Sequence, residues 1–75
     1  MNWQNHITAD PSVLVGKPLI KGTRISVEFI LDLISQGWAE EEILRNYHLQ
    51  QEQVRACVAY AQALLSEQKV FPVAA

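Results

Sequence analysis

The stretch from Gly16 to Val27 separates two unlike parts of this chain and therefore limits the folds that the chain can adopt. It contains two of the three glycines and three of the six basic residues in a sequence of 75 residues. Glycine adopts positive φ at no steric cost, and Pro18 fixes its own backbone and restricts Lys17 before it. The stretch is therefore expected to form a shaped loop or small hairpin that leads into a helix at Ser26.

Short apolar runs before and within this stretch predict two or three very short strands. The runs are Ile7–Ala9, Val13–Val15 and Leu19–Ile20. Asp10 and Pro11 form a turn signal between the first two runs. Strands of this length are not stable alone, so they are expected to pack on helices or to pair with a second copy of the chain.

Three helices are predicted downstream, over residues 27–36, 39–47 and 51–67. Ser26 offers a hydroxyl that can cap the first helix, and Gly37 is a typical residue just past its end. Ala39 and Gln50 stand at the starts of the other two helices, and neither is a good cap.

Apolar residues at helical spacing predict one buried face on each helix. These faces comprise Phe29, Ile30, Leu33 and Ile34 in the first helix, Ile43, Leu44 and Tyr47 in the second, and Val54, Cys57, Val58, Ala61, Leu64 and Leu65 in the third. The predicted fold is mainly α: a three-helix, helix-turn-helix-like bundle of the homeodomain-like or winged-helix-like type, with a short N-terminal β lead-in or hairpin. It forms one domain, with a lead-in over residues 1–25, a helical core over 26–67 and a tail over 68–75.

The chain resembles the family called domain of unknown function 433 in three segments: Gly16-Lys-Pro-Leu-Ile-Lys-Gly-Thr-Arg-Ile-Ser-Val27, Glu41-Glu-Ile-Leu44 and Gln53-Val-Arg-Ala56. The resemblance extends from about Ile7 to Leu65. Members of that family are small prokaryotic proteins, and many look like antitoxins that are encoded beside a nuclease-like toxin of the PIN type. The resemblance implies a helix-turn-helix-like fold, a homodimer and no catalytic residues.

Composition limits the classes to which the protein can belong. A hydrophobic fraction of 49% is too high for a disordered chain, and no apolar run approaches the roughly 20 residues that span a bilayer. The N-terminal segment lacks the basic and apolar pattern of a signal peptide, so a cytoplasmic protein is expected. A chain of 75 residues buries a modest core, and a homodimer would allow it to bury more.

The charges are unevenly distributed along the chain. The net charge of −2 argues against a strongly basic nucleic-acid-binding surface. Through Arg24, however, three basic residues accompany one acid, whereas from Ile25 onward seven acids accompany three basic residues. The basic part permits phosphate contacts, and the acidic part equally permits contact with a basic protein.

Two sets of residues are candidates for contact with operator DNA. In a helix-turn-helix, the N-terminal residues of the last helix enter the major groove, where glutamine and arginine can pair with base edges. The residues of this type in the third helix are Gln51, Gln53 and Arg55. The candidates for phosphate contact are Lys17, Lys21 and Arg24.

Each set also has an ordinary structural interpretation. The start of the third helix is equally explained as a solvated face, because Glu52 and the three glutamates from Glu40 would repel phosphate. Arg24 is equally explained as a fork-shaped donor that pins its loop to a carboxylate or to carbonyl groups at a helix end.

A protein partner would have apolar residues to contact. Trp38, Val70 and Phe71 are the candidates, since an apolar C-terminal segment can become ordered on binding. The alternative is that Phe71 folds back onto the small helical core.

No catalytic, cofactor or metal site is expected, and no small-molecule substrate. His6 and His48 are far apart and have no partner at metal-ligand spacing. Cys57 lies within an apolar helical stripe, which favours a buried thiol.

Two kinds of function remain. By resemblance, the chain is expected to be an antitoxin-like protein that neutralises a PIN-type nuclease toxin by direct binding, and that binds its own promoter DNA as a dimer. The alternative is a helical interaction module or a regulator with neither a toxin nor a nucleic-acid partner.

Overall fold

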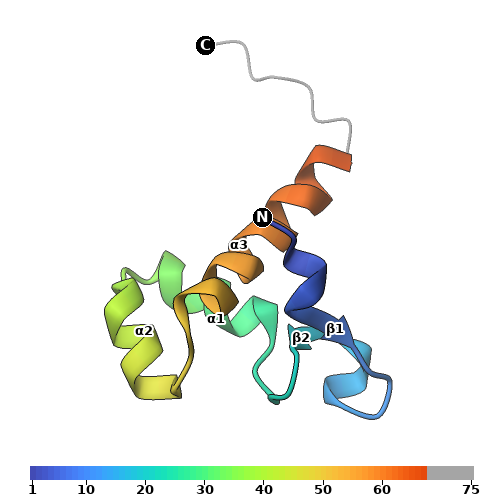
Figure 1. The fold of residues 1–75 in the computed structure, drawn as a ribbon, viewed down its shortest axis with the longest axis horizontal. Coiled ribbons are helices and arrows are strands. Elements are labelled where there is room, and N and C mark those ends of the chain that lie inside the picture. Colours follow the sequence, from blue (N-terminus) through green and yellow to red (C-terminus); the bar gives the residue numbers. More distant parts are fainter. Residues whose placement is uncertain (68–75) are drawn as a thin grey trace.

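The computed structural model describes residues 1–67 of the chain. A two-stranded antiparallel sheet is followed by three helices (Figure 1). The elements are η1 (Trp3–Asn5), β1 (Ile7–Ala9), η2 (Leu14–Gly16), β2 (Pro18–Ile20), α1 (Val27–Ser35), α2 (Glu40–Tyr47) and α3 (Gln51–Glu67), where η denotes a short 3-10 helix. The predicted mainly α class with an N-terminal hairpin is confirmed. None of the described helices is both long enough and apolar enough to cross a membrane.

Strands β1 and β2 form the predicted hairpin. Ile7 pairs with Ile20, and Ala9 pairs with Pro18, which is tolerated because it is the first residue of its strand. Ile7, Leu19 and Ile20 are buried, so the hairpin lies against the helices on its apolar side chains. This packing is required because an isolated two-stranded hairpin is only marginally stable in water.

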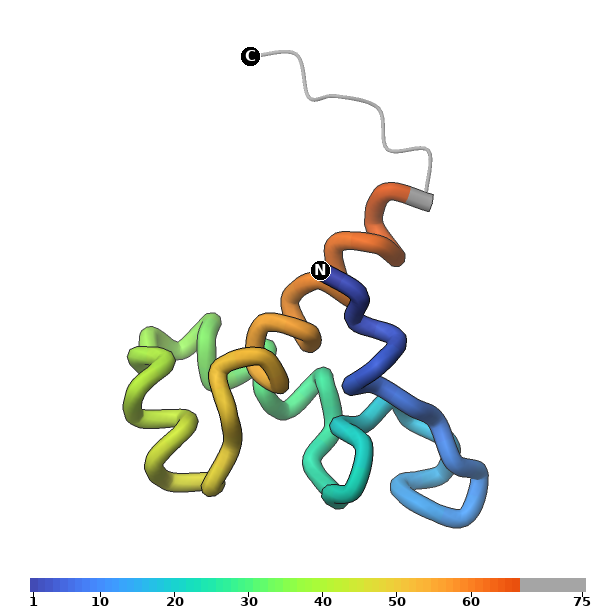
Figure 2. Tube along the Cα trace, viewed as in Figure 1, coloured from blue at the N-terminus to red at the C-terminus, as the bar shows by residue number. Residues whose placement is uncertain are grey.

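The prediction of a strand over Val13–Val15 is wrong. Leu14, Val15 and Gly16 have φ values of 51°, 55° and 77°, so the chain makes a left-handed turn there. Figure 2 shows this segment as part of the loop that joins the two strands. Because the register sets Ala9 opposite Pro18, the intervening residues must reverse the chain, and this requirement overrides the β propensity of an apolar run.

The first helix has the ends that the sequence predicts. The backbone N–H of Phe29 donates to Ser26 Oγ at 3.0 Å, so Ser26 is the N-cap. Gly37 has a φ of 93°, and the N–H groups of Gly37 and Trp38 donate to the carbonyl oxygens of Ile34 and Leu33. This pair of bonds is a Schellman motif, which satisfies carbonyl groups that the end of the helix leaves free.

The second helix begins without a side-chain cap, as expected for Ala39. Instead, the Ala39 backbone N–H donates to Glu42 Oε1 at 2.9 Å. This is the reciprocal half of a capping box, in which the third residue of the helix reaches back to the residue before it. The carboxylate also lies at a helix N-terminus, where negative charge is favourable.

The core lies between the hairpin and the three helices. Its buried residues are Ile7, Ile20, Val27, Ile30, Leu33, Ile43, Leu49, Val54, Ala56 and Cys57. The predicted helix faces are therefore only partly buried, because Phe29 and Ile34 of α1 and Val58, Leu64 and Leu65 of α3 remain exposed. For α3, Figure 1 shows that its second half extends beyond α1 and α2. There only η1 packs against it among the described helices, with the rings of Trp3 and Tyr60 4.9 Å apart.

Candidate functional site

Thr23 shapes the turn between β2 and α1. Its backbone N–H and its hydroxyl both donate to the carbonyl oxygen of Ile20, at 3.1 and 2.8 Å. The same hydroxyl accepts a hydrogen bond from the Ile25 N–H at 3.0 Å. Gly22 supplies the positive φ of 78° that this turn needs. The threonine of the Gly-Thr-Arg-Ile segment therefore has a structural role.

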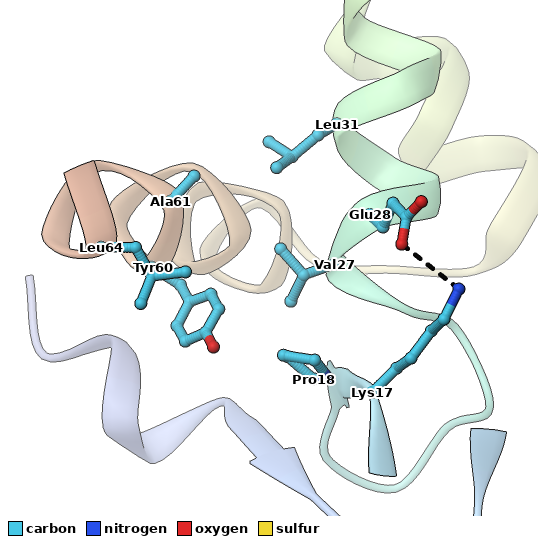
Figure 3. A pocket seen from close by; sticks show the side chains of 8 residues that line it. All are labelled: Lys17, Pro18, Val27, Glu28, Leu31, Tyr60, Ala61 and Leu64. Atoms are coloured by element: carbon cyan, nitrogen blue, oxygen red, sulfur yellow. Dashed lines mark hydrogen bonds and ion pairs between the residues drawn. The ribbon is translucent and has the colours of Figure 1, made fainter. Parts of the chain in front are cut away.

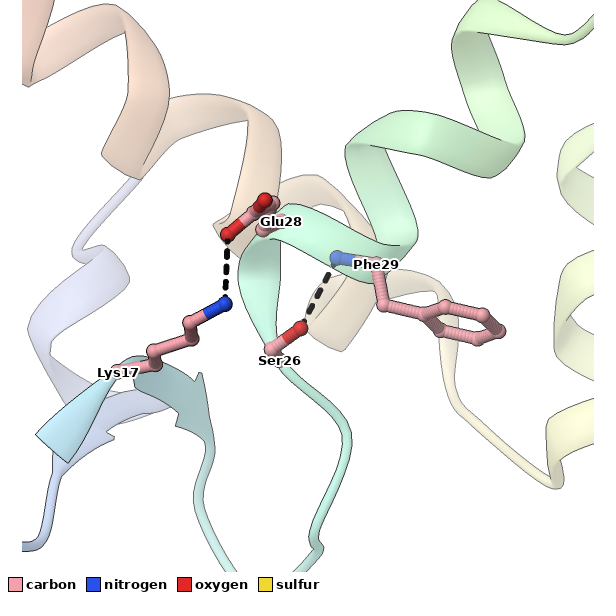
Figure 4. Close-up of polar contacts among 4 residues, drawn as sticks. All are labelled: Lys17, Ser26, Glu28 and Phe29. Carbon is pink, nitrogen blue, oxygen red and sulfur yellow. Dashed lines mark hydrogen bonds and ion pairs between the residues drawn. The ribbon is translucent and has the colours of Figure 1, made fainter. Parts of the chain in front are cut away.

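The three basic residues of this region differ in their surroundings. Lys17 Nζ lies 3.3 Å from Glu28 Oε2 in an exposed ion pair (Figure 4). Lys21 and Arg24 are exposed, and within residues 1–67 neither has a carboxylate at ion-pair distance. Among the described residues, no carboxylate lies within ion-pair distance of Arg24. The loop is therefore held by the hydrogen bonds of Thr23 and not by an ion pair of Arg24.

The three candidates on α3 also differ from one another. Gln51 is exposed at the first turn. Gln53 is half-buried, and its Oε1 accepts a hydrogen bond from the Gln50 backbone N–H at 2.7 Å. Arg55 is exposed, with its Nε 3.9 Å from Glu40 Oε1. Gln53 therefore has a structural role at the start of α3, which leaves Gln51 and Arg55 as the more accessible side chains.

The residues predicted to contact phosphates and those predicted to contact bases lie on separate elements. Lys17 lies directly before β2, and Lys21 and Arg24 belong to the turn before α1. Gln51 and Arg55 follow the turn between α2 and α3. In the view of Figure 1, both turns lie along the lower edge of the molecule.

An aromatic cluster lies where α1 meets α2. The rings of Phe29 and Tyr47 meet edge to face with centroids 5.3 Å apart, and Trp38 lies 6.3 Å from Tyr47. Phe29 is 39% exposed, and the other two rings are half-buried. Figure 4 shows the Phe29 ring pointing away from the Lys17–Glu28 pair. Of these rings the sequence singled out only Trp38 as a contact residue, because the spacing of Phe29 and Tyr47 predicts burial. Val70 and Phe71 lie outside the described residues.

A groove lies between β2, the start of α1 and the second half of α3. It encloses about 260 Å³, and its walls are formed mainly by apolar side chains (Figure 3). The lining residues are Lys17, Pro18, Val27, Glu28, Leu31, Tyr60, Ala61 and Leu64. The groove offers apolar contact area with a single ion pair, Lys17–Glu28, at its edge.

Cys57 is fully buried, as the sequence predicts. Its desolvation raises the pKa of the thiol to about 11, so the group is protonated at neutral pH. A thiol in this state is a poor nucleophile and a poor metal ligand. In the part of the chain that the structure describes, no group of three or more His, Cys, Asp or Glu residues is placed to hold a metal ion.

Comparison with known proteins identifies the family. The model of the family described as "Protein of unknown function (DUF433)" matches residues 7–61. The chain belongs to the DUF433 family. Its fold is similar to the crystal structure of a DUF433 member from Anabaena variabilis ATCC 29413, with a TM-score of 0.77 and 32% sequence identity. That likeness covers 85% of this chain and 64% of the Anabaena chain.

The DUF433 resemblance first seen in three sequence segments is therefore confirmed. Among curated proteins, no match was found. Family membership accounts for the hairpin and the helical core, and the family description gives no activity.

Proposed function

We propose that this DUF433 protein is an antitoxin-like interaction protein, which neutralises a PIN-type nuclease toxin by binding it stoichiometrically. The observation that carries the proposal is the partly exposed aromatic cluster of Phe29, Trp38 and Tyr47. The antitoxin-like character of many proteins that the sequence resembles supports it.

The cluster has the properties of a protein-binding site. Tyrosine and tryptophan are enriched among the residues that contribute most to interface affinity. The edge-to-face contact between Phe29 and Tyr47 fixes both rings before any partner arrives, so little side-chain entropy is lost on binding.

The charges beside the cluster favour a basic partner. Glu40, Glu41 and Glu42 follow Trp38 after one intervening residue, Ala39, and the last two glutamates are exposed. A nuclease binds a polyanion, so its substrate groove carries positive charge. An acidic helix start next to an aromatic anchor is complementary to such a groove and would block it.

Binding of promoter DNA as a dimer is a second proposed function. The supporting observation is that Lys21 and Arg24 are exposed at one turn, without a carboxylate at ion-pair distance among residues 1–67. Exposed cations of this kind can neutralise phosphates. Gln51 at the start of α3 would then be the base-reading candidate, since Gln53 already accepts a hydrogen bond within the protein.

Co-expression with the product of the neighbouring gene tests the leading proposal. We expect the two proteins to co-elute, and the neighbour alone to arrest growth. Phe29→Glu should abolish co-elution, because it places a charge on the aromatic surface. The matched control is Val15→Glu, which changes a side chain that is 94% exposed in the loop between the strands.

Two results would contradict this proposal. One is a neighbour that neither arrests growth nor co-elutes. The other is a complex that Phe29→Glu leaves intact, which would place the partner on another surface.

A further inference from the structure

We infer that residues 70–73 of this chain fold back along α3, and that the ring of Phe71 fills the apolar groove between β2, α1 and the second half of α3. The groove is formed by residues that the structure describes, and residues 70–73 follow the described part of the chain. This contact needs neither a toxin nor DNA, so it is tested separately from the functions proposed above. It assigns Phe71 to the core of its own chain and not to a partner.

The groove presents apolar surface that the described residues leave open. It encloses about 260 Å³, whereas a cavity of roughly 150 Å³ already holds benzene, so a phenyl ring fits. Leu64 forms part of its α3 wall and is still 45% exposed. Burial of apolar surface is the main favourable term in folding. An apolar side chain placed in the groove would therefore stabilise the domain.

The 3-10 helix η1 covers a different side of α3. Trp3 of η1 packs on Tyr60, with the two ring centroids 4.9 Å apart. Trp3 does not line the groove, whereas Leu31 points toward it from α1 and Leu64 lines it from α3 (Figure 3). The packing of η1 therefore leaves the groove open to another segment.

The end of α3 places residues 70–73 within reach of the groove. The described part of α3 runs to Glu67. At a rise of about 1.5 Å per residue, Leu64 and Tyr60 lie about 5 and 10 Å back along the helix axis from Glu67. If residues 68 and 69 turn the chain, residues 70–73 in an extended form span about 13 Å. The segment is therefore long enough to run beside both groove residues.

Residues 68–75 have the composition of a segment that packs against an apolar surface. Lys69 is their sole charged residue, so they bring no acidic group toward Glu28 at the edge of the groove. Pro72 disfavours a helical backbone at Phe71, which favours a chain that leaves the helix and turns back. The apolar members with large side chains are Val70, Phe71 and Val73.

The covalent connection favours this segment over any separate molecule. A short flexible linker holds a segment near its site at an effective concentration in the millimolar range. A second copy of the chain or another protein would have to reach a comparable concentration, or bind much more tightly, to displace it. The position of the groove beside the end of α3 therefore favours Phe71 as its occupant.

Nuclear Overhauser effects in the full chain test the proposal directly. We expect effects between the ring protons of Phe71 and the methyl groups of Leu31 and Leu64. A sample that mixes isotope-labelled with unlabelled chains separates contacts within one chain from contacts between chains, and we expect none between chains. This measurement uses the unchanged sequence, so it does not depend on how any variant folds.

A double-mutant cycle in urea unfolding tests the energetic coupling. We expect Phe71→Ala to raise the equilibrium constant of unfolding at least about tenfold in the otherwise unchanged protein. In a Leu31→Ala background it should raise the constant less than about threefold, because the ring has already lost a groove contact. The matched control is Val15→Ala in the loop between the strands, whose effect should be the same in both backgrounds.

Three outcomes would overturn the proposal. One is the lack of any Overhauser effect between Phe71 and the groove residues. Another is an effect that occurs only between different chains, which would make the groove a contact between copies. The third is an equal effect of Phe71→Ala in the two backgrounds, which would show that the ring and Leu31 are not coupled.

Discussion

Gln53 Oε1 accepts a hydrogen bond from the backbone N–H of Gln50 at 2.7 Å, so a residue that could read DNA bases is already used to begin α3. Glu42 makes the equivalent bond to Ala39 at the start of α2, at 2.9 Å. Both helices lack a capping residue of the usual kind, and both use the third helical residue instead.

Replacement of Gln53 should therefore affect folding before it affects any partner. We expect Gln53→Ala to lower the free energy of unfolding by about 1 kcal/mol, because the Gln50 N–H loses its acceptor. Gln53→Glu should stay within about 0.5 kcal/mol of the unchanged protein, since a carboxylate makes the same bond and suits a helix N-terminus. Urea unfolding measures both. Equal loss in the two variants would show that the hydrogen bond contributes nothing.

Removal of the Thr23 hydroxyl should loosen the turn before α1. Thr23→Val keeps the shape of the side chain but leaves the Ile25 N–H without its partner, and we expect a loss of about 1–2 kcal/mol in urea unfolding. Thr23→Ser retains the hydroxyl and should lose less than half as much. If Thr23→Val loses little and Thr23→Ser loses more, the methyl group of Thr23, and not its hydrogen bonds, stabilises the turn.

Cys57 should make the stability of the protein depend on alkaline pH. The folded thiol has a pKa of about 11, raised by desolvation above the ordinary value near 9. The contribution of the thiol to the free energy of unfolding is therefore fully present below about pH 9. It is lost as the pH rises toward 11, because in this range the thiol is deprotonated in the unfolded state and still protonated in the folded state. The loss should reach at most about 2–3 kcal/mol. Urea unfolding of Cys57→Ala, which has no thiol, should show a smaller decline over the same pH range, and parallel declines would contradict this account.

The salt dependence of any DNA binding should identify the phosphate contacts. We expect Lys21→Gln and Arg24→Gln each to reduce the slope of log affinity against log salt by about 0.9. Lys17→Gln should reduce it less, because Lys17 already pairs with Glu28 at 3.3 Å. Titrations of labelled promoter DNA at several salt concentrations measure the slopes. An unchanged slope in the first two variants would remove this turn from the DNA-binding surface.

Much of the fold could be predicted from local sequence signals. Ser26 and Gly37 predicted the ends of α1, and each makes the contacts expected of its position. The strands at Ile7–Ala9 and Pro18–Ile20 and the span of α3 were also close to prediction. These features depend on contacts within a few residues, so their chemistry is readable in the chain itself.

The candidate surfaces were less predictable. Spacing assigned Phe29, Leu64 and Leu65 to buried faces, but their side chains are 39%, 45% and 61% exposed, because the neighbouring elements cover them only in part. Periodicity shows which residues share a side of a helix, and it does not show how far the neighbouring helix reaches. The loss of the Val13–Val15 strand has a similar origin, since the register of the hairpin decided how that segment had to turn.

The sequence by itself determined the three helices, the hairpin, the buried Cys57 and the DUF433 signature, because propensity, capping and apolar spacing act along the chain. Only the tertiary structure decided that Thr23 and not Arg24 holds the signature turn, that Gln53 accepts the hydrogen bond at the start of α3, and that Val58, Leu64 and Leu65 of α3 remain exposed. Those features depend on which groups come within hydrogen-bond or packing distance once distant segments meet. Which groups meet in this way is set by the arrangement of the helices and strands in space, and not by the sequence of any one of them.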